Sequence, residues 1–183
     1  MKLHIFGASG PGTTTLGKKL AQLLNCKHLD ADDYYWEPTD PAYQHKVPPA
    51  LRNEHITQDF ERHETVIISG SLVSWGKRWE SAFNLAVFLY LPHTLRMERL
   101  KEREVRRYGD LLRTNKTAIS NYKAFLQWAA QYDDETFDGR SLKRHEQWMD
   151  RLQCPTLRIE GDTTVTERAK LVVERMHSMG YAQ

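Results

Sequence analysis

The sequence has few cysteines and no long hydrophobic segment. Its 183 residues include two cysteines, Cys26 and Cys154, which form no CxxC pair; two reduced thiols are expected, with a disulfide as the alternative. No apolar run approaches the roughly 20 residues that cross a bilayer. The N-terminus also lacks the apolar segment and cleavage site of a signal peptide, so we expect a cytoplasmic protein without a membrane partner.

An excess of one charge is missing as well. The 26 lysines and arginines nearly balance the 24 aspartates and glutamates, which leaves a net charge of +2. Proteins that bind nucleic acid generally have a stronger basic excess, so we do not expect nucleic acid as a partner. The length suits one domain over residues 1–183, and a monomer and a homodimer are both open.

Short apolar runs alternate with longer amphipathic segments along the chain. This alternation predicts an α/β fold in which helices cover both faces of a parallel sheet. A loop rich in proline and aromatic residues interrupts it at about 34–49. The expected strands are 3–6, 27–30, 66–69, 85–90 and 156–159, and the expected helices are about 13–24, 50–63, 94–107, 119–131, 142–152 and 165–179.

The clearest motif lies between the first expected strand and the first expected helix. Its glycines let the backbone approach a ligand closely, and its amides, with those that open the helix, can form a nest for an anion. Triphosphate oxygens fit such a cradle, so we expect ATP and Mg²⁺ as cofactors; a glycine-rich turn without a ligand is the alternative. The residues are Gly7, Ala8, Ser9, Gly10, Pro11, Gly12, Thr13, Thr14 and Thr15.

Two positions of this motif bear on catalysis. Thr14 stands where the pattern G-x-x-x-x-G-K-[ST] places the hydroxyl that binds Mg²⁺, whereas Thr13 replaces the lysine. Lys18 is a poor substitute, because on a helix it points about 140° away from position 13, and Lys19 lies further from the cradle. Losing such a donor typically costs about 10²–10³ in rate, unless arginines from elsewhere offset the loss.

With this loop, the chain resembles the adenylate-kinase-like branch of P-loop kinases, which includes shikimate kinase and gluconate kinase. It most resembles small bacterial adenylate-kinase-like proteins of the FlaR topology-modulation type. The same Gly-Ala-Ser-Gly-x-Gly-Thr-Thr-Thr loop occurs there, so Thr13 need not mark a degenerate site. The resemblance implies a three-layer fold with a five-stranded parallel sheet in the order 2-3-1-4-5. It also implies an acceptor-binding flap at about 34–63 and a helical lid at about 103–135.

Acidic residues follow the second expected strand. Asp30 and Asp32 lie at the carboxyl edge of the predicted sheet, beside the phosphate cradle. Shikimate and gluconate kinases have a similar Asp-x-Asp, so the resemblance implies that Asp32 meets the acceptor or acts as base and that Asp30 holds Mg²⁺ through water. The third strand ends in Ser69, where many P-loop proteins have an aspartate. A solvated acidic turn is the alternative.

Arginines at a spacing of four share one face of the helix after the fourth strand. Kinases of this branch close a lid whose arginines grip phosphate oxygens. The resemblance therefore implies that Arg103 and Arg107 contact phosphate and that Arg99 lies near the adenine or the lid hinge. Gly161 and Asp162, after the fifth strand, are implied as the turn that contacts adenine. A solvated charged face is the alternative for the arginines.

Aromatic residues on the proline-rich loop predict a wall of the acceptor pocket, with Tyr35 and Trp36 as the candidates. Arg52 opens the following helix and can meet an acceptor phosphate, and Arg78 faces the same region by topology. For each of these residues a packing or surface role is the alternative. The eight histidines have no metal-ligand spacing, and His4 is expected in the core.

These features predict an ATP-binding kinase that transfers the γ-phosphoryl group to a small nucleotide or polyol-like acceptor. The alternative is a nucleotide-binding regulator or sensor with little or no turnover. Thr13 and the absence of an acid on the third strand favour that alternative.

Overall fold

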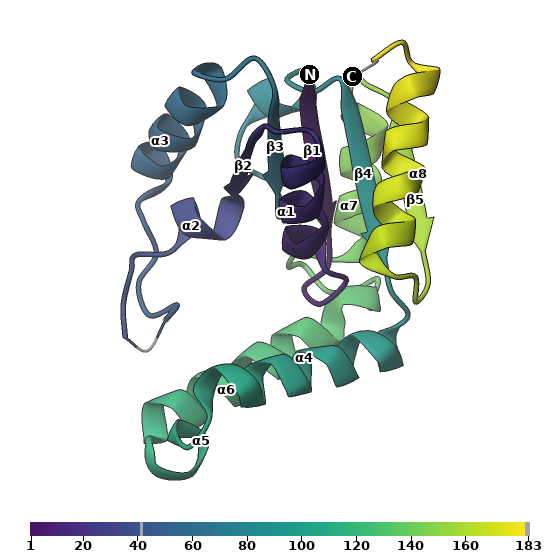
Figure 1. Ribbon diagram of the computed structural model, residues 1–183. Helices are drawn as coiled ribbons and strands as arrows, with labels where there is room; N and C mark the ends of the chain where they lie inside the picture. The colour runs from purple at the N-terminus through teal and green to yellow at the C-terminus, as the bar shows by residue number, and fades with distance from the viewer. Residues whose placement is uncertain (41, 182–183) are drawn as a thin grey trace.

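Five parallel strands form the central sheet of the protein, in the order β2-β3-β1-β4-β5 (Figure 1). The computed structural model describes residues 1–40 and 42–181, so Pro41 of the expected loop and residues 182–183 lie outside it. The parallel sheet and its strand order confirm the sequence prediction. The strands are β1 (Lys2–Gly7), β2 (Lys27–Asp30), β3 (Val66–Ser69), β4 (Leu85–Tyr90) and β5 (Thr156–Glu160).

The interior strand β4 illustrates why these segments form strands. Leu85, Val87 and Leu89 belong to the apolar core on one side of the sheet, whereas Ala86 and Phe88 belong to the core on the other side. None of the five side chains is more than 1% exposed. A parallel strand that is covered on both faces needs apolar residues at consecutive positions, which is the pattern in the sequence.

Four helices cover the sheet as two outer layers (Figure 1). One layer consists of α1 (Thr13–Leu23) and α8 (Val165–Ser178), and the other of α3 (Pro49–Glu61) and α7 (Leu142–Arg151). No helix in the described part of the chain is both long and apolar enough to cross a bilayer. The helices bury a small set of large side chains: Leu16, Leu20, Val172 and Met176 in the first layer, and Ile56, Phe60 and Trp148 in the second.

After β4 the chain leaves the sheet and forms an arm, residues 93–133, that extends along the carboxyl edge (Figure 1). The arm contains α4 (His93–Tyr108), α5 (Leu111–Thr114) and α6 (Lys116–Ala130), and a 3-10 turn at Gln131–Asp133 ends it. The segment expected as a lid, about 103–135, lies mostly within this arm. Its helices contact one another along α4 and α6, so the arm is a packed unit and not an isolated loop.

The predicted loop at 34–49 differs from the structure at its start, where the chain forms α2 (Ala31–Tyr35). The Asp30 carboxylate caps this short helix by accepting a hydrogen bond from the amide of Asp32 at 3.1 Å. The sequence prediction missed the helix because five residues are too few to show a helical period. A second 3-10 turn, at Lys77–Glu80, follows β3.

Only the first part of the expected flap at 34–63 is a loop outside the core. Trp36 and Lys46 form an isolated antiparallel bridge that closes the loop before α3. In contrast, α3 places Ile56 and Phe60 in the core, with exposures of 0% and 5%. Because a helix that fills the core cannot move without unpacking it, α3 belongs to the body of the protein. We use "flap" below for residues 36–48 alone.

Candidate functional site

The phosphate loop, residues 7–15, joins β1 to α1 at the carboxyl edge of the sheet. Gly10 and Gly12 have φ angles of 106° and 96°, which side chains other than hydrogen rarely permit. A Cβ atom on Gly10 would lie 3.1 Å from two side chains of α4, so the arm also limits this position to glycine. No side chain among the described residues caps α1, whose first amides therefore remain available to an anion. This geometry fits the phosphate tail of ATP.

Arg168 of α8 is hydrogen-bonded to the backbone of the phosphate loop. Its guanidinium donates hydrogen bonds to the carbonyl oxygen of Pro11, to the carbonyl oxygen of Gly161 at 3.1 Å and to the hydroxyl of Thr163 at 2.8 Å. Burial lowers the pKa of Arg168, and the nearby Arg99 lowers it further. The arginine thus ties the loop to the turn after β5, which is the predicted adenine-binding turn. Sequence reasoning missed it, because a charged residue in an amphipathic helix normally indicates a surface position.

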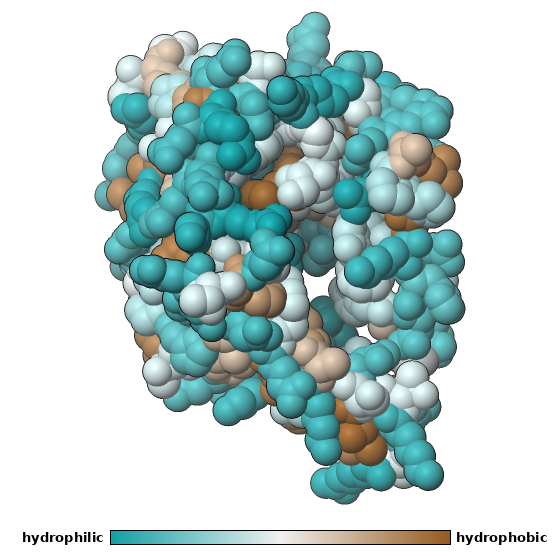
Figure 2. Space-filling model, turned by 180° about the vertical axis from the view of Figure 1, so that it is seen from behind, coloured by the Kyte–Doolittle hydropathy of each residue, from teal (hydrophilic) through white to brown (hydrophobic). Residues whose placement is uncertain are grey.

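A cavity of about 570 Å³ lies between the phosphate loop, α2, the flap and the arm. The space-filling view in Figure 2 shows the molecule hollowed between the flap and the arm. Six of the sequence-predicted site residues line this one space, although they come from three separate segments of the chain. They are Ser9, Asp32, Tyr35, Trp36, Arg103 and Arg107.

Asp32 contributes a carboxylate to the cavity from the first turn of α2. The loss of hydration raises the pKa of this carboxyl group, and the nearby Asp30 raises it further. The positive charges of Arg140, Arg103 and Arg107 act in the opposite direction. A carboxylate with a raised pKa holds a proton more readily, which suits a group that accepts a proton from a hydroxyl.

Arg103 and Arg107 share one partner, the carboxylate of Glu104. Each guanidinium lies 2.8 Å from Oε1 of Glu104, whose side chain is only 3% exposed. Arg107 also reaches the flap, where its Nη2 is 3.3 Å from the hydroxyl of Tyr43. The carboxylate of Glu104 therefore compensates part of the positive charge of the two arginines at the cavity. Each guanidinium keeps N–H donors for a further anion.

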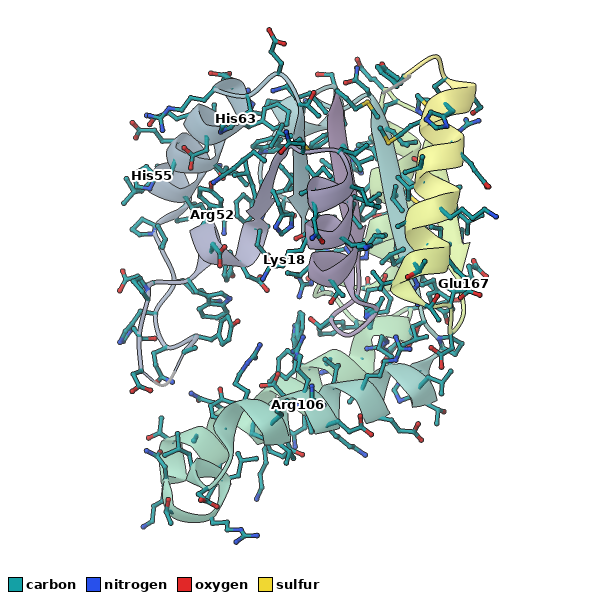
Figure 3. All side chains as sticks on the ribbon, viewed as in Figure 1. Lys18, Arg52, His55, His63, Arg106 and Glu167 are labelled. Carbon is teal, nitrogen blue, oxygen red and sulfur yellow. The ribbon has the colours of Figure 1, made fainter. Side chains whose placement is uncertain are left out.

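The other two predicted arginines of the acceptor pocket have different surroundings. Arg52 lies between the rings of Tyr35 and Trp75, at 4.9 and 4.3 Å from their centres, and supports the cavity wall from the side of α3 that faces α2 (Figure 3). Arg78 forms an exposed ion pair with Glu61 at 2.9 Å. Neither arginine lines the cavity described above. Topology placed Arg78 after the correct strand, but the 3-10 turn there directs it to the end of α3.

Arg99 and the turn after β5 lie together. The guanidinium of Arg99 forms an ion pair with the carboxylate of Asp162. Gly161 has a φ of 83°, and among the described residues there is open space at the position that its Cβ would occupy, although its amide donates to the carbonyl oxygen of Tyr90 and its carbonyl accepts from Arg168. Contact of this turn with adenine stays a prediction.

The predicted Mg²⁺ residues lie at the ends of two neighbouring elements. Thr14 is in the first turn of α1, and Asp30 ends β2. Ser69 pairs with Asp30 in the sheet, but its hydroxyl is 2.9 Å from Nε2 of His28 and so is already engaged. Within the described residues, no three His, Cys, Asp or Glu side chains cluster as a metal site. Mg²⁺ commonly takes one or two protein oxygens and completes its shell with water and phosphate, and the Thr14 hydroxyl and the Asp30 carboxylate are oxygen donors of that kind.

A buried hydrogen-bonded chain that the sequence did not reveal ends at the cavity. The hydroxyl of Tyr132 is 2.6 Å from Nδ1 of His145, and Nε2 of His145 is 2.9 Å from the hydroxyl of Ser71, which lines the cavity. Burial lowers the pKa of His145 well below its usual value, so the ring is neutral and one nitrogen donates while the other accepts. Burial raises the pKa of the Tyr132 phenol, so this hydroxyl keeps its proton. In the tautomer in which Tyr132 donates to Nδ1, Nε2–H donates to Ser71 and leaves the Ser71 proton for a group in the cavity.

Arg140 is the second cavity residue that the sequence did not single out. It precedes α7, and its Nη2 donates to the hydroxyl of Ser9 in the phosphate loop at 3.1 Å, across 131 residues of sequence. Its guanidinium also lies 4.9 Å from the centre of the Trp128 ring. Only the fold brings this arginine to the loop, and no local pattern marks it.

Comparison with known proteins identifies a relative and a shared fold. The chain is 40% identical over 176 residues to the uncharacterized protein YqaC of Bacillus subtilis (strain 168), covering 96% of this chain and 97% of YqaC. Shikimate kinase from Acinetobacter baumannii in complex with shikimate superposes with a TM-score of 0.58 at 17% identity, over 99% of this chain and 95% of that chain. Deoxyadenosine kinase from M. mycoides gives a TM-score of 0.54 at 14% identity, over 97% and 100%. No protein-family model matches the chain.

Proposed function

Since the chain belongs to the family of Bacillus subtilis YqaC and has the fold of P-loop kinases, we propose that it is an ATP-dependent kinase that phosphorylates a small molecule. One observation carries this proposal: the phosphate loop and the Asp32 carboxylate open on the same cavity. Phosphoryl transfer needs the donor phosphate and the acceptor hydroxyl in line within one enclosed space, with positive charge around them. The arginines of the arm provide such charge.

The roles of the loop and the acids follow from their positions. The amides of residues 7–15 would hold the phosphate tail, and Thr14 with Asp30 would hold Mg²⁺. ATP bound there would supply the γ-phosphoryl group, which gains a bond to the acceptor oxygen as its bond to the bridging oxygen of ADP breaks. Asp32 would accept the proton that the acceptor hydroxyl loses. Arg103 and Arg107 would neutralise charge on the transferring group.

The acceptor side of the cavity combines aromatic rings with cationic groups. Tyr35 of α2 with Trp36 and Tyr43 of the flap forms one side, and Phe125 and Trp128 form the arm side. Aromatic walls suit a nucleotide or nucleoside base, whereas the polar groups Asp32 and Ser71 suit a polyol. Both acceptor classes therefore belong in the first test.

A screen of ADP release tests the proposal. The purified protein with MgATP is mixed with nucleoside monophosphates, nucleosides and polyols, and ADP is measured with and without each acceptor. Stimulation by one class is expected. The Asp32→Asn variant should then lose the stimulation while calorimetry shows unchanged ATP binding. If ATP binds and no member of a broad panel stimulates release, the kinase proposal fails.

A nucleotide-binding regulator is the second candidate. Two observations favour it: Thr13 occupies the lysine position of the loop, and the Ser69 hydroxyl is engaged by His28, so β3 offers no acid for Mg²⁺. Tight ATP binding that alters protection of the arm in hydrogen exchange, with no turnover on any acceptor, would select this function.

A further inference from the structure

We propose that Arg140 supplies to bound ATP the positive charge that the phosphate loop lacks at position 13. This inference rests on the proposed ATP site but goes further, because it assigns a role to a residue outside every recognisable motif. Thr13 opens α1 and carries no charge. The next basic residue of the helix, Lys18, lies near His28 and Asp33 and is exposed. A cation beside the bound phosphates would therefore come from another segment.

Arg140 reaches the required place. Its Nη2 donates to the hydroxyl of Ser9 in the middle of the loop, at 3.1 Å. The same side chain lines the cavity that Asp32 lines, and its charge lowers the pKa of the Asp32 carboxyl group against the effect of burial. Arg140 thus stands between the phosphate cradle and the carboxylate that faces the acceptor. A γ-phosphoryl group in transit would pass between those two groups.

The donors of Arg140 are not used up by the protein. An arginine has five N–H donors, and Ser9 receives one of them. Within the described residues, the Nε atom of Arg140 is buried and has no hydrogen-bond partner. A buried N–H group without a partner costs free energy unless a ligand or water satisfies it. Phosphate oxygens would satisfy it, and the fork of a guanidinium matches their geometry.

The backbone around Arg140 is held in place by packing. Ser141, which is 1% exposed, caps α7 with its hydroxyl. A Cβ on Gly139 would lie 2.1 Å from the Phe137 ring, so the preceding turn is closely packed. The guanidinium itself lies 4.9 Å from the centre of the Trp128 ring. A charge that is oriented before the ligand arrives loses less entropy on binding than a free lysine does.

The test compares Arg140→Met with a loop that regains its lysine. Calorimetry measures binding of ATP and AMP, each with Mg²⁺, to wild type, Arg140→Met, Thr13→Lys and the double variant. Loss of a charge-assisted hydrogen bond should weaken ATP binding by about 10- to 100-fold in Arg140→Met and leave AMP binding within about twofold. Thr13→Lys should restore most of that loss in the Arg140→Met background, and it should raise the ATP affinity less in wild type, where Arg140 already supplies the charge. If Arg140 only positions Ser9, a lysine at position 13 would not restore the ATP affinity that Arg140→Met loses.

Two further variants keep the result interpretable. Arg151→Met, in the same helix region but paired with Glu80 at 2.9 Å and away from the cavity, should bind ATP as wild type does. Arg140→Lys keeps the charge and should retain more affinity than Arg140→Met; if Arg140→Met does not fold, a loss in Arg140→Lys that Thr13→Lys reverses supports the proposal equally. The proposal is overturned if Arg140→Met binds ATP like wild type, or if Thr13→Lys has the same effect in both backgrounds. Wild type that binds no ATP would instead refute the proposed function.

Discussion

Arg107 of α4 and Tyr43 of the flap meet across the mouth of the cavity. Nη2 of Arg107 lies 3.3 Å from the phenolic oxygen, and the guanidinium is 4.6 Å from the centre of the ring. Trp36 packs edge-on against the same ring at 5.7 Å. Tyr43 has a φ of 67°, an unfavourable value for a residue with a side chain. Such strain persists only where surrounding contacts hold it, which here are the contacts between the flap and the arm.

The strain at Tyr43 can be measured by comparing two small substitutions. Tyr43→Ala removes the ring and keeps the strained backbone, whereas Tyr43→Gly removes both. We expect the glycine variant to be more stable than the alanine variant by about 1 kcal/mol in urea unfolding. At Tyr122, in the middle of α6, the order should reverse, because glycine destabilises a helix by about 1 kcal/mol relative to alanine. If the glycine variant were the more stable one at both positions, or the alanine variant at both, the backbone strain proposed at Tyr43 would be contradicted.

Gly10 should be required for ATP binding, since its φ is 106° and a Cβ atom would press on α4 at 3.1 Å. Gly10→Ala is therefore expected to weaken ATP binding clearly in calorimetry. Gly76 is a matched control, because it has a φ of 118° and nothing lies within 4 Å of its Cβ position. Gly76→Ala should cost about 1–2 kcal/mol of stability and leave ATP binding unchanged. Equal effects of both substitutions on ATP binding would refute a specific role for Gly10.

Arg96 is expected to anchor the arm. Its side chain is buried, and its guanidinium donates to the carbonyl oxygen of Ala129 and to the carboxylate of Asp133, each at 2.7 Å. Arg96→Met leaves these acceptors without their donor and should destabilise the protein by about 3 kcal/mol in urea unfolding. The exposed pair of Arg62 with Asp59 is the comparison, and Arg62→Met should cost about 1 kcal/mol or less. If Arg96→Met and Arg62→Met lost the same unfolding free energy, the buried contacts of Arg96 would contribute no more to stability than an exposed ion pair.

Stability should fall in mild acid because of two buried histidines. Burial lowers the pKa of His4 to about 4 and that of His145 well below its usual value. Below about pH 6.5 the unfolded chain binds protons at these residues and the folded chain does not. The free energy of unfolding should therefore decrease by about 1.4 kcal/mol per pH unit for each histidine as the pH falls from about 6.5 toward 4.

Urea unfolding between pH 5 and 6.5 checks this dependence. His4→Phe should reduce the slope of the unfolding free energy by about 1 kcal/mol per pH unit relative to wild type. His55, exposed on the outer side of α3 (Figure 3), is the control, and His55→Gln should keep the wild-type slope. A His4→Phe variant that retains the full slope would show that His4 does not titrate differently in the two states.

Local patterns were sufficient for the sheet and for the phosphate loop. Apolar runs such as that of β4 are continuous in sequence, and Gly10 and Gly12 lie between a strand and a helix that are adjacent in the chain. Parallel strands place their carboxyl ends at one edge, so the proximity of Asp32 to the loop also followed from topology. The expectation for Arg78 was less accurate, because topology gives the edge of the sheet but not the direction of a side chain in a turn.

The amino-acid sequence by itself determined the parallel α/β fold and the positions of the glycine-rich loop and of the acidic residues at the carboxyl edge of the sheet. These properties depend on residues that are neighbours along the chain, where periodicity and glycine spacing carry the information. Only the tertiary structure decided which arginines reach the cradle: Arg140 and Arg168 come from segments more than a hundred residues away, and Ser71 gains its orientation from His145. Contacts of that range depend on how helices pack against the sheet, and no local pattern encodes them.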